Sequence, residues 1–273
     1  MKLSTEEKLR LKASYGPWSL ITGASSGIGL ELATRLAEAG LNVILHGRRA
    51  LELQRISQDL KTRFNIQTDI VSADLSTDEG VQELLKETTK RPIGLVIASA
   101  GFGTSGLFHQ SNLSDEVNML RVNCESLLVL IHHFSNQFAQ QKRGGIILLS
   151  SMVGFQGVPF AAHYAATKAY VQSLGEALAV ELKPFGVDVL TAAPGPVASE
   201  FGKRANLKMD MALSPQQVVV PILSALGRKD TILPGWLTKL LVYALRTVPR
   251  WGKVRIMQKV MGGMTKHQRS MVA

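Results

Sequence analysis

The chain has 273 residues, of which 45% are hydrophobic and 19% are charged, and it contains one cysteine. This composition fits a globular domain and excludes both a disordered chain and a disulfide-stabilised one. The net charge of +10 lies near the C-terminus: residues 1–200 have 18 Lys+Arg against 19 Asp+Glu, whereas residues 201–273 have 13 against 2.

The N-terminus lacks the apolar core of a signal peptide, and no stretch approaches the roughly 20 apolar residues that span a bilayer. We therefore expect a cytoplasmic protein. The first segment, residues 1–16, is expected to be a helical N-terminal extension within a main domain that begins at residue 1.

Short apolar runs alternate with amphipathic segments from residue 18 onward. Runs rich in Val, Ile and Leu without strict alternation are typical of strands covered on both faces. They predict strands at 18–22, 42–46, 70–73, 94–99, 146–150, 187–192 and 231–233, and helices at 28–39, 50–64, 77–88, 115–140 and 162–183. Glycines at 40, 144, 145 and 186 are expected to end helices.

This alternation predicts an α/β fold, a Rossmann-type doubly wound parallel sheet of about seven strands flanked by helices. We expect the main domain to end near residue 235. Residues 236–273 would then form a basic helical extension on or near the same domain.

A glycine-rich turn follows the first predicted strand and opens the first helix of the domain. Glycines at this point let the backbone approach a pyrophosphate, and the helix start offers free N–H groups. The alternative is an ordinary tight turn. The residues of this candidate phosphate cradle are Gly23, Ser25, Ser26, Gly27, Ile28 and Gly29.

The spacing Gly-x-x-x-Gly-x-Gly in this position resembles that of the short-chain dehydrogenase/reductase (SDR) family, in its compact single-domain branch. The resemblance covers about residues 15–235. It implies a nicotinamide dinucleotide cofactor, an oxidoreductase activity and a homodimer or homotetramer that pairs through the helices predicted at 115–140 and 162–183.

The second strand is followed by Gly47, Arg48 and Arg49. An NAD enzyme would place a carboxylate here for the ribose 2′-hydroxyl, whereas a guanidinium binds a 2′-phosphate. We therefore predict NADP(H), with Arg48 as the first candidate and Arg49 as the second. The alternative is a solvated arginine pair at a helix start.

Two further strand ends match the family's cofactor site. The resemblance places Asp74 and Leu75 beside the adenine ring, although Asp74 could instead cap the next turn. After the fourth strand, Ala100 and Gly101 keep the family's close approach to the ribose. The two asparagines that usually precede them are replaced by Ala98 and Ser99.

Tyr164 and Lys168 are one helical turn apart, and Ser151 lies thirteen positions before the tyrosine at a strand end. Residues i and i+4 share a helix face, so an ammonium beside the phenol is expected to lower its pKa from about 10. Ser151 can donate a hydrogen bond to a substrate oxygen, and Ser150 is its adjacent competitor. This set resembles the family's active site.

The resemblance adds a fourth member, Asn123, which would hold a helix bend; a plain surface position is the alternative. After the sixth strand, it places Pro194, Gly195, Val197 and Ser199 over the nicotinamide, with Ser199 where the family usually has threonine. A Pro/Gly loop without a ligand is the alternative there.

The histidines show no metal-site spacing, so we expect no metal. On a helix, the side chain of His163 points in a different direction from that of Tyr164. It is therefore expected at the rim of the site or in solvent. Cys124 is expected to be a small buried residue.

Residues 200–215 would form a substrate lid, whose apolar side chains suggest a lipophilic substrate: Phe201, Leu207, Met209, Met211 and Leu213. The extension combines an apolar stripe with basic residues, which suits a peripheral membrane contact, an acidic carrier protein or simple packing on the body. Nothing indicates nucleic-acid binding.

We therefore expect an NADP(H)-dependent oxidoreductase that transfers a hydride between nicotinamide and a carbonyl or secondary alcohol, such as a 3-oxoacyl or steroid-like compound. The alternative is an NADP(H)-binding regulatory or scaffold protein with little turnover.

Overall fold

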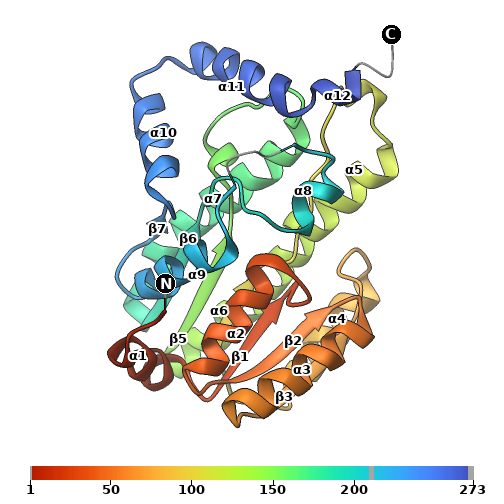
Figure 1. Ribbon diagram of the computed structural model, residues 1–273. Helices are drawn as coiled ribbons and strands as arrows, with labels where there is room; N and C mark the ends of the chain where they lie inside the picture. Colours follow the sequence, from red (N-terminus) through yellow and green to blue (C-terminus); the bar gives the residue numbers. More distant parts are fainter. Residues whose placement is uncertain (1, 209–211, 270–273) are drawn as a thin grey trace.

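The computed structural model describes residues 2–208 and 212–269, and its centre is one seven-stranded sheet (Figure 1). All neighbouring strands are parallel, and their order is β3-β2-β1-β4-β5-β6-β7. The predicted doubly wound sheet is confirmed. The strands are β1 (Trp18–Thr22), β2 (Asn42–Gly47), β3 (Thr68–Ser72), β4 (Ile93–Ala98), β5 (Gly144–Leu149), β6 (Val187–Ala192) and β7 (Thr231–Ile232).

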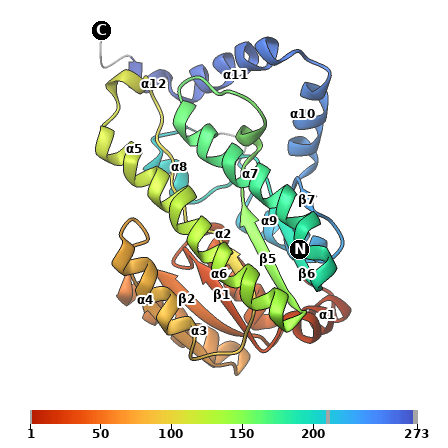
Figure 2. The ribbon, with the colours of Figure 1, turned by 180° about the vertical axis from the view of Figure 1, so that it is seen from behind.

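Helices cover both faces of the sheet, as Figures 1 and 2 show from opposite sides. One face packs against α2 (Gly27–Glu38), α3 (Ala50–Phe64) and α9 (Pro215–Ala225) in a single apolar cluster. The other packs against α4 (Asp78–Thr88), α6 (Ser126–Gln141) and α7 (Ala162–Leu182). Because both faces are buried, the central strands are mostly apolar without strict alternation, which is the signal that predicted them.

Two glycines expected to end a helix belong instead to β5. Gly144 and Gly145 are its first two residues, and both are buried. A side chain at Gly145 would come within 2.8 Å of the Tyr15 ring, and one at Gly144 would meet the Phe138 ring. Aromatic rings from two helices therefore require glycine here, a constraint that the local sequence does not reveal.

The helix predicted at 115–140 is interrupted. It consists of α5 (Leu113–Leu120), a π-helical turn (Arg121–Glu125) and α6. A π-turn inserts one extra residue and bends the helix. Asn123, for which the family resemblance implied a role at a helix bend, lies within this π-helical turn.

Helix α9 was not predicted, although its start has a clear sequence signal. Ser214 and Gln217 form a capping box, and Pro215 occupies the first turn. The lid predicted at 200–215 therefore ends where α9 begins. In α9, Val218, Val219 and Val220 are all buried.

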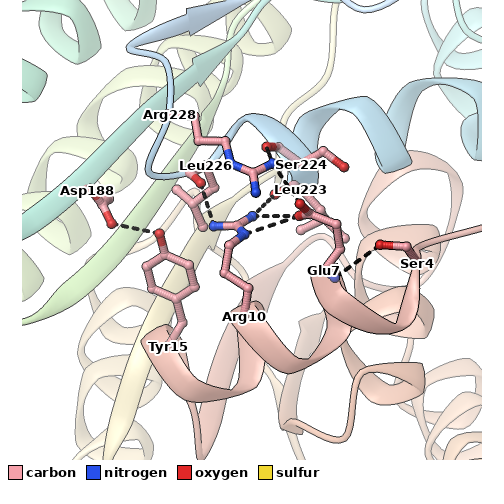
Figure 3. Close-up of polar contacts among 9 residues, drawn as sticks. All are labelled: Ser4, Glu7, Arg10, Tyr15, Asp188, Leu223, Ser224, Leu226 and Arg228. Atoms are coloured by element: carbon pink, nitrogen blue, oxygen red, sulfur yellow. Dashed lines mark hydrogen bonds and ion pairs between the residues drawn. The ribbon is translucent and has the colours of Figure 1, made fainter.

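Helix α1 (Thr5–Tyr15) lies near the N-terminus and is fixed to the body by polar contacts (Figure 3). Arg10 donates to the carbonyl oxygens of Leu226 (2.8 Å) and Leu223 (2.9 Å) at the end of α9. The Tyr15 hydroxyl donates to Asp188 at 2.7 Å. These bonds join the two ends of the main domain.

We expect Arg10→Met to lower the free energy of unfolding by about 1–3 kcal/mol, because it removes charge-assisted bonds to helix-end carbonyls. Urea denaturation measures this change. Arg63→Met is the matched control, since Arg63 forms an exposed i,i+4 pair with Asp59 and should change stability by less than about 0.5 kcal/mol. Equal losses in the two variants would contradict the assigned role of Arg10.

The C-terminal extension is helical, as predicted: α10 (Trp236–Arg246), α11 (Arg250–Met264) and α12 (Lys266–Arg269). It lies across the end of the molecule at which α7 begins (Figures 1 and 2). None of the helices within the described residues is long and apolar enough to cross a membrane.

Candidate active site

The predicted site residues converge at the carboxyl ends of β1, β4, β5 and β6. The glycine-rich turn follows β1, Gly101 follows β4 and Ser151 follows β5. The chain continues from β1 to β2 on one side, while β4 lies on the other. Such a reversal of strand order opens a crevice at the carboxyl edge, where doubly wound proteins bind ligands.

Ser151 and Tyr164 form the centre of this site. Ser151 begins the short turn Met152–Phe155, and its side chain forms a hydrogen bond with the Tyr164 phenol. The neighbouring Ser150 is buried and donates its hydroxyl to the backbone oxygen of Lys168 at 2.9 Å. The geometry therefore separates the two serines: Ser150 supports the helix, and Ser151 faces the phenol.

Lys168 lies one turn beyond Tyr164 on α7 and is only 7% exposed. Its Nζ donates to the backbone oxygen of Leu149 at 2.7 Å and lies 5.9 Å from the centre of the Tyr164 ring. Burial lowers the pKa of the Lys168 ammonium to about 8. This lysine is held by the end of β5 and does not form an ion pair in the described structure.

The expected lowering of the tyrosine pKa is wrong for this structure. Burial raises the pKa of Tyr164 to about 12, and the hydrogen bond with Ser151 offsets only part of that effect. The reason is geometric: the Lys168 ammonium points to the Leu149 carbonyl, so desolvation of the phenol dominates. At neutral pH, the Tyr164 phenol is consequently protonated.

Asn123 is 1% exposed, which excludes the surface position. Its Oδ1 accepts from the Phe102 N–H at 3.1 Å, and its Nδ2 donates to the Phe102 oxygen at 2.9 Å and to Thr167 Oγ1 at 3.0 Å. Asn123 thereby ties the π-turn to the loop after β4 and to α7, next to Lys168.

The glycine-rich turn has the shape that a dinucleotide requires. Gly23 and Gly27 have positive φ values of 69° and 58°, and a side chain at Gly23 would come within 2.9 Å of the Ala100 backbone. Helix α2 starts at Gly27. The side chain of its N-cap residue, Ser26, makes no capping hydrogen bond. Its first N–H groups and positive dipole end therefore suit a pyrophosphate, with Ser25 and Ile28 flanking the turn.

In the segment 98–101, Ala98 and Ser99 stand where the family usually has two asparagines. This segment is held by contacts with β1. Ser99 Oγ donates to the Thr22 backbone oxygen at 2.5 Å. The N–H groups of Ser99 and Ala100 donate to Thr22 Oγ1 at 3.1 and 3.0 Å. Thr22, which was not singled out from the sequence, thus holds the floor of the crevice.

Arg48 and Arg49 both lie at the carboxyl end of β2 but have different partners. Arg48 approaches Asp74 at 3.4 Å, and both side chains are substantially exposed. Arg49 donates to the oxygen and hydroxyl of Ser25 and pairs with Glu200 at 2.8 Å. Arg48 is thus the less restrained of the two, and Arg49 links the glycine turn to Glu200.

Asp74 also makes the turn that was considered as its alternative role. Its Oδ1 accepts from the backbone and hydroxyl of Ser76, both at 3.0 Å. Leu75 is 5% exposed and belongs to the apolar cluster beneath the sheet. The side chain of Leu75 therefore packs into the core.

The loop after β6 crosses the site and is held at both ends. The Met152 N–H donates to the Pro194 oxygen at 3.0 Å, and Val197 pairs with Leu213. A side chain at Gly195 would come within 2.6 Å of the Thr238 hydroxyl of α10. The C-terminal extension therefore reaches the site, which no local motif indicated.

Ser199 is the N-cap residue of helix α8 (Glu200–Arg204), and its hydroxyl donates to the Val197 oxygen at 3.3 Å. In α8, the Phe201 ring lies 5.2 Å from the Tyr164 ring, centre to centre. Leu207 joins Tyr164 and Met264 in one apolar cluster. Two residues of the predicted lid, Met209 and Met211, lie outside the described residues.

His163 is partly buried rather than free in solvent. Its Nδ1 lies 2.7 Å from Oε2 of Glu116, which comes from α5 and is 4% exposed. Cys124 is buried, as expected, and burial raises the pKa of its thiol to about 11. In the described structure, neither side chain forms a hydrogen bond with the Tyr164 side chain.

The sequence model of the short chain dehydrogenase family matches residues 17–210. This chain belongs to that family. The match includes the glycine turn, Ser151, Tyr164 and Lys168, and it confirms the resemblance drawn from the motifs.

Individual relatives of this short-chain dehydrogenase are oxidoreductases by name. A 7beta-hydroxysteroid dehydrogenase of Mediterraneibacter gnavus is 28% identical over 234 residues, covering 83% of this chain and 89% of the relative. A very-long-chain 3-oxoacyl-CoA reductase-like protein of Arabidopsis thaliana is 31% identical, with 88% and 79% covered. The structure of a short-chain dehydrogenase from Sphingobium yanoikuyae in complex with NADPH matches with a TM-score of 0.79 and 27% identity, over 85% of this chain and 92% of the other.

Proposed function

We propose that this short-chain dehydrogenase is an NADP(H)-dependent oxidoreductase that interconverts a carbonyl compound and its secondary alcohol. The observation that carries the proposal is the convergence of Ser151, Tyr164 and Lys168 beside an uncapped helix start at the carboxyl edge of the sheet. A buried proton donor beside a dinucleotide cradle is the arrangement that carbonyl reduction needs.

In the reductive direction, the bound nicotinamide would supply a hydride to the carbonyl carbon. The Ser151 hydroxyl would donate a hydrogen bond to the carbonyl oxygen and so stabilise the charge that develops there. Tyr164, a neutral phenol at pH 7, would transfer its proton to that oxygen. Lys168 would stabilise the resulting phenolate, which regains its proton from solvent; alcohol oxidation reverses these steps.

The preference for NADP(H) rests on charge at the end of β2. Gly47 leaves no carboxylate there to bind a ribose 2′-hydroxyl, and Arg48 offers a partly free guanidinium. The NADPH bound by the related Sphingobium yanoikuyae enzyme supports this assignment. Asp74 neutralises part of the Arg48 charge, and a 2′-phosphate would compete with it.

We propose a lipophilic substrate. The Phe201 ring lies beside the Tyr164 ring, and Leu207 and Met264 belong to the same apolar cluster as Tyr164. These side chains give an apolar wall that favours a steroid-like, long-chain 3-oxoacyl or other bulky ketone. The names of the two relatives, a hydroxysteroid dehydrogenase and a 3-oxoacyl-CoA reductase, point to the same class.

The test follows NADPH absorbance with a panel of steroid ketones, 3-oxoacyl thioesters, bulky aryl ketones and small polar ketones, with NADH in parallel. We expect turnover with NADPH and higher kcat/KM for the apolar members. Tight NADPH binding without turnover of any carbonyl compound would favour the regulatory alternative and overturn the proposal.

The reaction should also depend on pH through Lys168. A pKa of about 8 means that the ammonium loses its proton well below the usual range for lysine. We therefore expect kcat/KM for reduction to be constant at neutral pH and to fall as pH rises above about 8, because the phenolate of Tyr164 loses its neighbouring positive charge. In Lys168→Arg, the charge persists and this alkaline fall should disappear. A wild-type profile that stays flat well into the alkaline range would contradict the assigned role.

We also propose a homo-oligomer that pairs through α6 and α7. Both helices expose apolar side chains, among them Leu128 and Val129 of α6 and Tyr170 and Val180 of α7. Sedimentation velocity would report the oligomeric state.

A further inference from the structure

The C-terminal extension has an inner and an outer face of different character. On the inner face, Val242 packs against Ala193 and Leu233, while Met257 and Met261 pack against the start of α7. The outer face has no covering element in the described structure, and it lies along the edge of the molecule (Figures 1 and 2).

Large apolar side chains project from this outer face. In α10, Trp236, Leu240 and Tyr243 are 75%, 56% and 53% exposed, and their i, i+4, i+7 spacing places them on one side of the helix. In α11, Trp251 is 65% exposed. Exposure of such apolar side chains to water is energetically unfavourable, and a group of them marks an interaction surface.

The same two helices are strongly basic. Residues 236–269 contain eight Lys and Arg and no Asp or Glu. In the described part of the chain, no ion pair joins the seven of them from Lys239 to Lys266 to a carboxylate. Arg246 lies 4.7 Å from the Tyr243 ring centre, and Arg255 lies 5.3 Å from that of Trp251. Positive charge and aromatic surface are therefore interleaved.

We propose that the outer face of α10 and α11 binds the surface of an anionic phospholipid bilayer. Tryptophan and tyrosine favour the headgroup region of a bilayer, and lysine and arginine are attracted to anionic lipids. The exposed aromatic and basic side chains are spread over the lengths of two helices, which suits a lipid surface better than the compact patch of an acidic protein partner. Binding is peripheral, since neither helix is long enough to cross the membrane.

The position of this surface relates it to the site. The inner face of α11 contributes Met257 and Met261 to the cluster that contains Tyr164 and Leu207. A membrane held by the outer face would therefore lie close to the lid, where lipophilic carbonyl compounds partition from the bilayer. This consequence rests on the proposed function, whereas the binding itself does not.

The experiment is co-sedimentation of the full-length chain with vesicles of phosphatidylcholine alone or mixed with phosphatidylglycerol. We expect pelleting with the anionic vesicles, little with the neutral ones, and release at high salt. Tryptophan fluorescence adds a direct readout, because two of the three tryptophans lie on this surface and Trp18 is 4% exposed. Brominated lipids should quench the emission of Trp236 and Trp251.

Two variants test the two components of the surface. Lys239→Glu/Arg255→Glu/Lys259→Glu reverses exposed charges, and Trp236→Ser/Trp251→Ser removes the exposed rings. Each should reduce the bound fraction at least severalfold. Lys61→Glu/Lys86→Glu/Lys183→Glu makes the same change in net charge at exposed positions on other elements and should bind almost as the wild type does.

Equal loss of binding in the control variant, equal pelleting with neutral vesicles, or no pelleting with either would overturn the proposal. So would binding to an acidic carrier protein without binding to anionic vesicles. NADPH turnover of a water-soluble ketone, measured without vesicles, tests the enzyme separately, so a failure of membrane binding is distinguishable from a failure of the proposed function.

Discussion

Tyr164→Phe should lower kcat for carbonyl reduction by roughly 10²–10⁴-fold, the range expected when a general acid is removed. The variant keeps the ring that packs against Phe201 and loses only the hydroxyl that bonds with Ser151. NADPH binding should therefore be retained. Steady-state rates with the best ketone of the panel, together with NADPH titration by fluorescence, measure both quantities.

Tyr170→Phe is the matched control, because Tyr170 lies on the same helix and is 37% exposed. It should have wild-type kcat. Full turnover in Tyr164→Phe would show that another group supplies the proton, and the mechanism assigned to this site would be abandoned. Loss of NADPH binding along with turnover would instead indicate that the hydroxyl has a structural role.

Arg48→Ala should raise the KM for NADPH by roughly 10- to 100-fold, the equivalent of about 1.4–2.7 kcal/mol for a lost charge-assisted interaction. The KM for NADH should change little, because NADH has no 2′-phosphate. The mutation also frees Asp74, whose carboxylate would then repel NADPH further. Initial rates with each cofactor at a saturating ketone concentration measure the effect.

Arg55→Ala provides a control for the loss of one arginine, since Arg55 lies on α3 and pairs with Glu52 at an exposed position. Its KM values should match the wild type. Arg49→Ala should weaken both cofactors to a similar extent, because Arg49 holds Ser25 of the glycine turn. If Arg48→Ala affects NADH and NADPH equally, Arg48 does not recognise the 2′-phosphate.

Much of the fold was predictable because its signals are local. Each central strand is a mostly apolar run of five or six residues, and Ser4, Thr77 and Ser214 are helix N-caps of a common type. The errors have non-local causes. Gly144 and Gly145 are strand residues whose missing side chains make room for rings from α6 and α1, and the bend at Asn123 depends on Phe102 and Thr167.

The candidate site shows the same division. Spacing was enough to select Tyr164, Lys168 and Ser151, because helical periodicity and strand ends are read directly from the chain. Spacing could not show that Ser150 bonds with the helix backbone, that Thr22 supports the loop after β4, or that Thr238 of the extension reaches Gly195. These contacts join segments far apart in the sequence.

The sequence by itself determined the order of the elements and the glycine turn and selected the candidate reacting groups, because each depends on neighbours along the chain. Only the tertiary structure decided their electrostatics. Lys168 lies 5.9 Å from the centre of the Tyr164 ring but donates its hydrogen bond to Leu149, and burial raises the pKa of Tyr164 and lowers that of Lys168. Desolvation depends on every atom packed around a charge, and those atoms come from α8, α11 and the strand ends, which meet only in the folded chain.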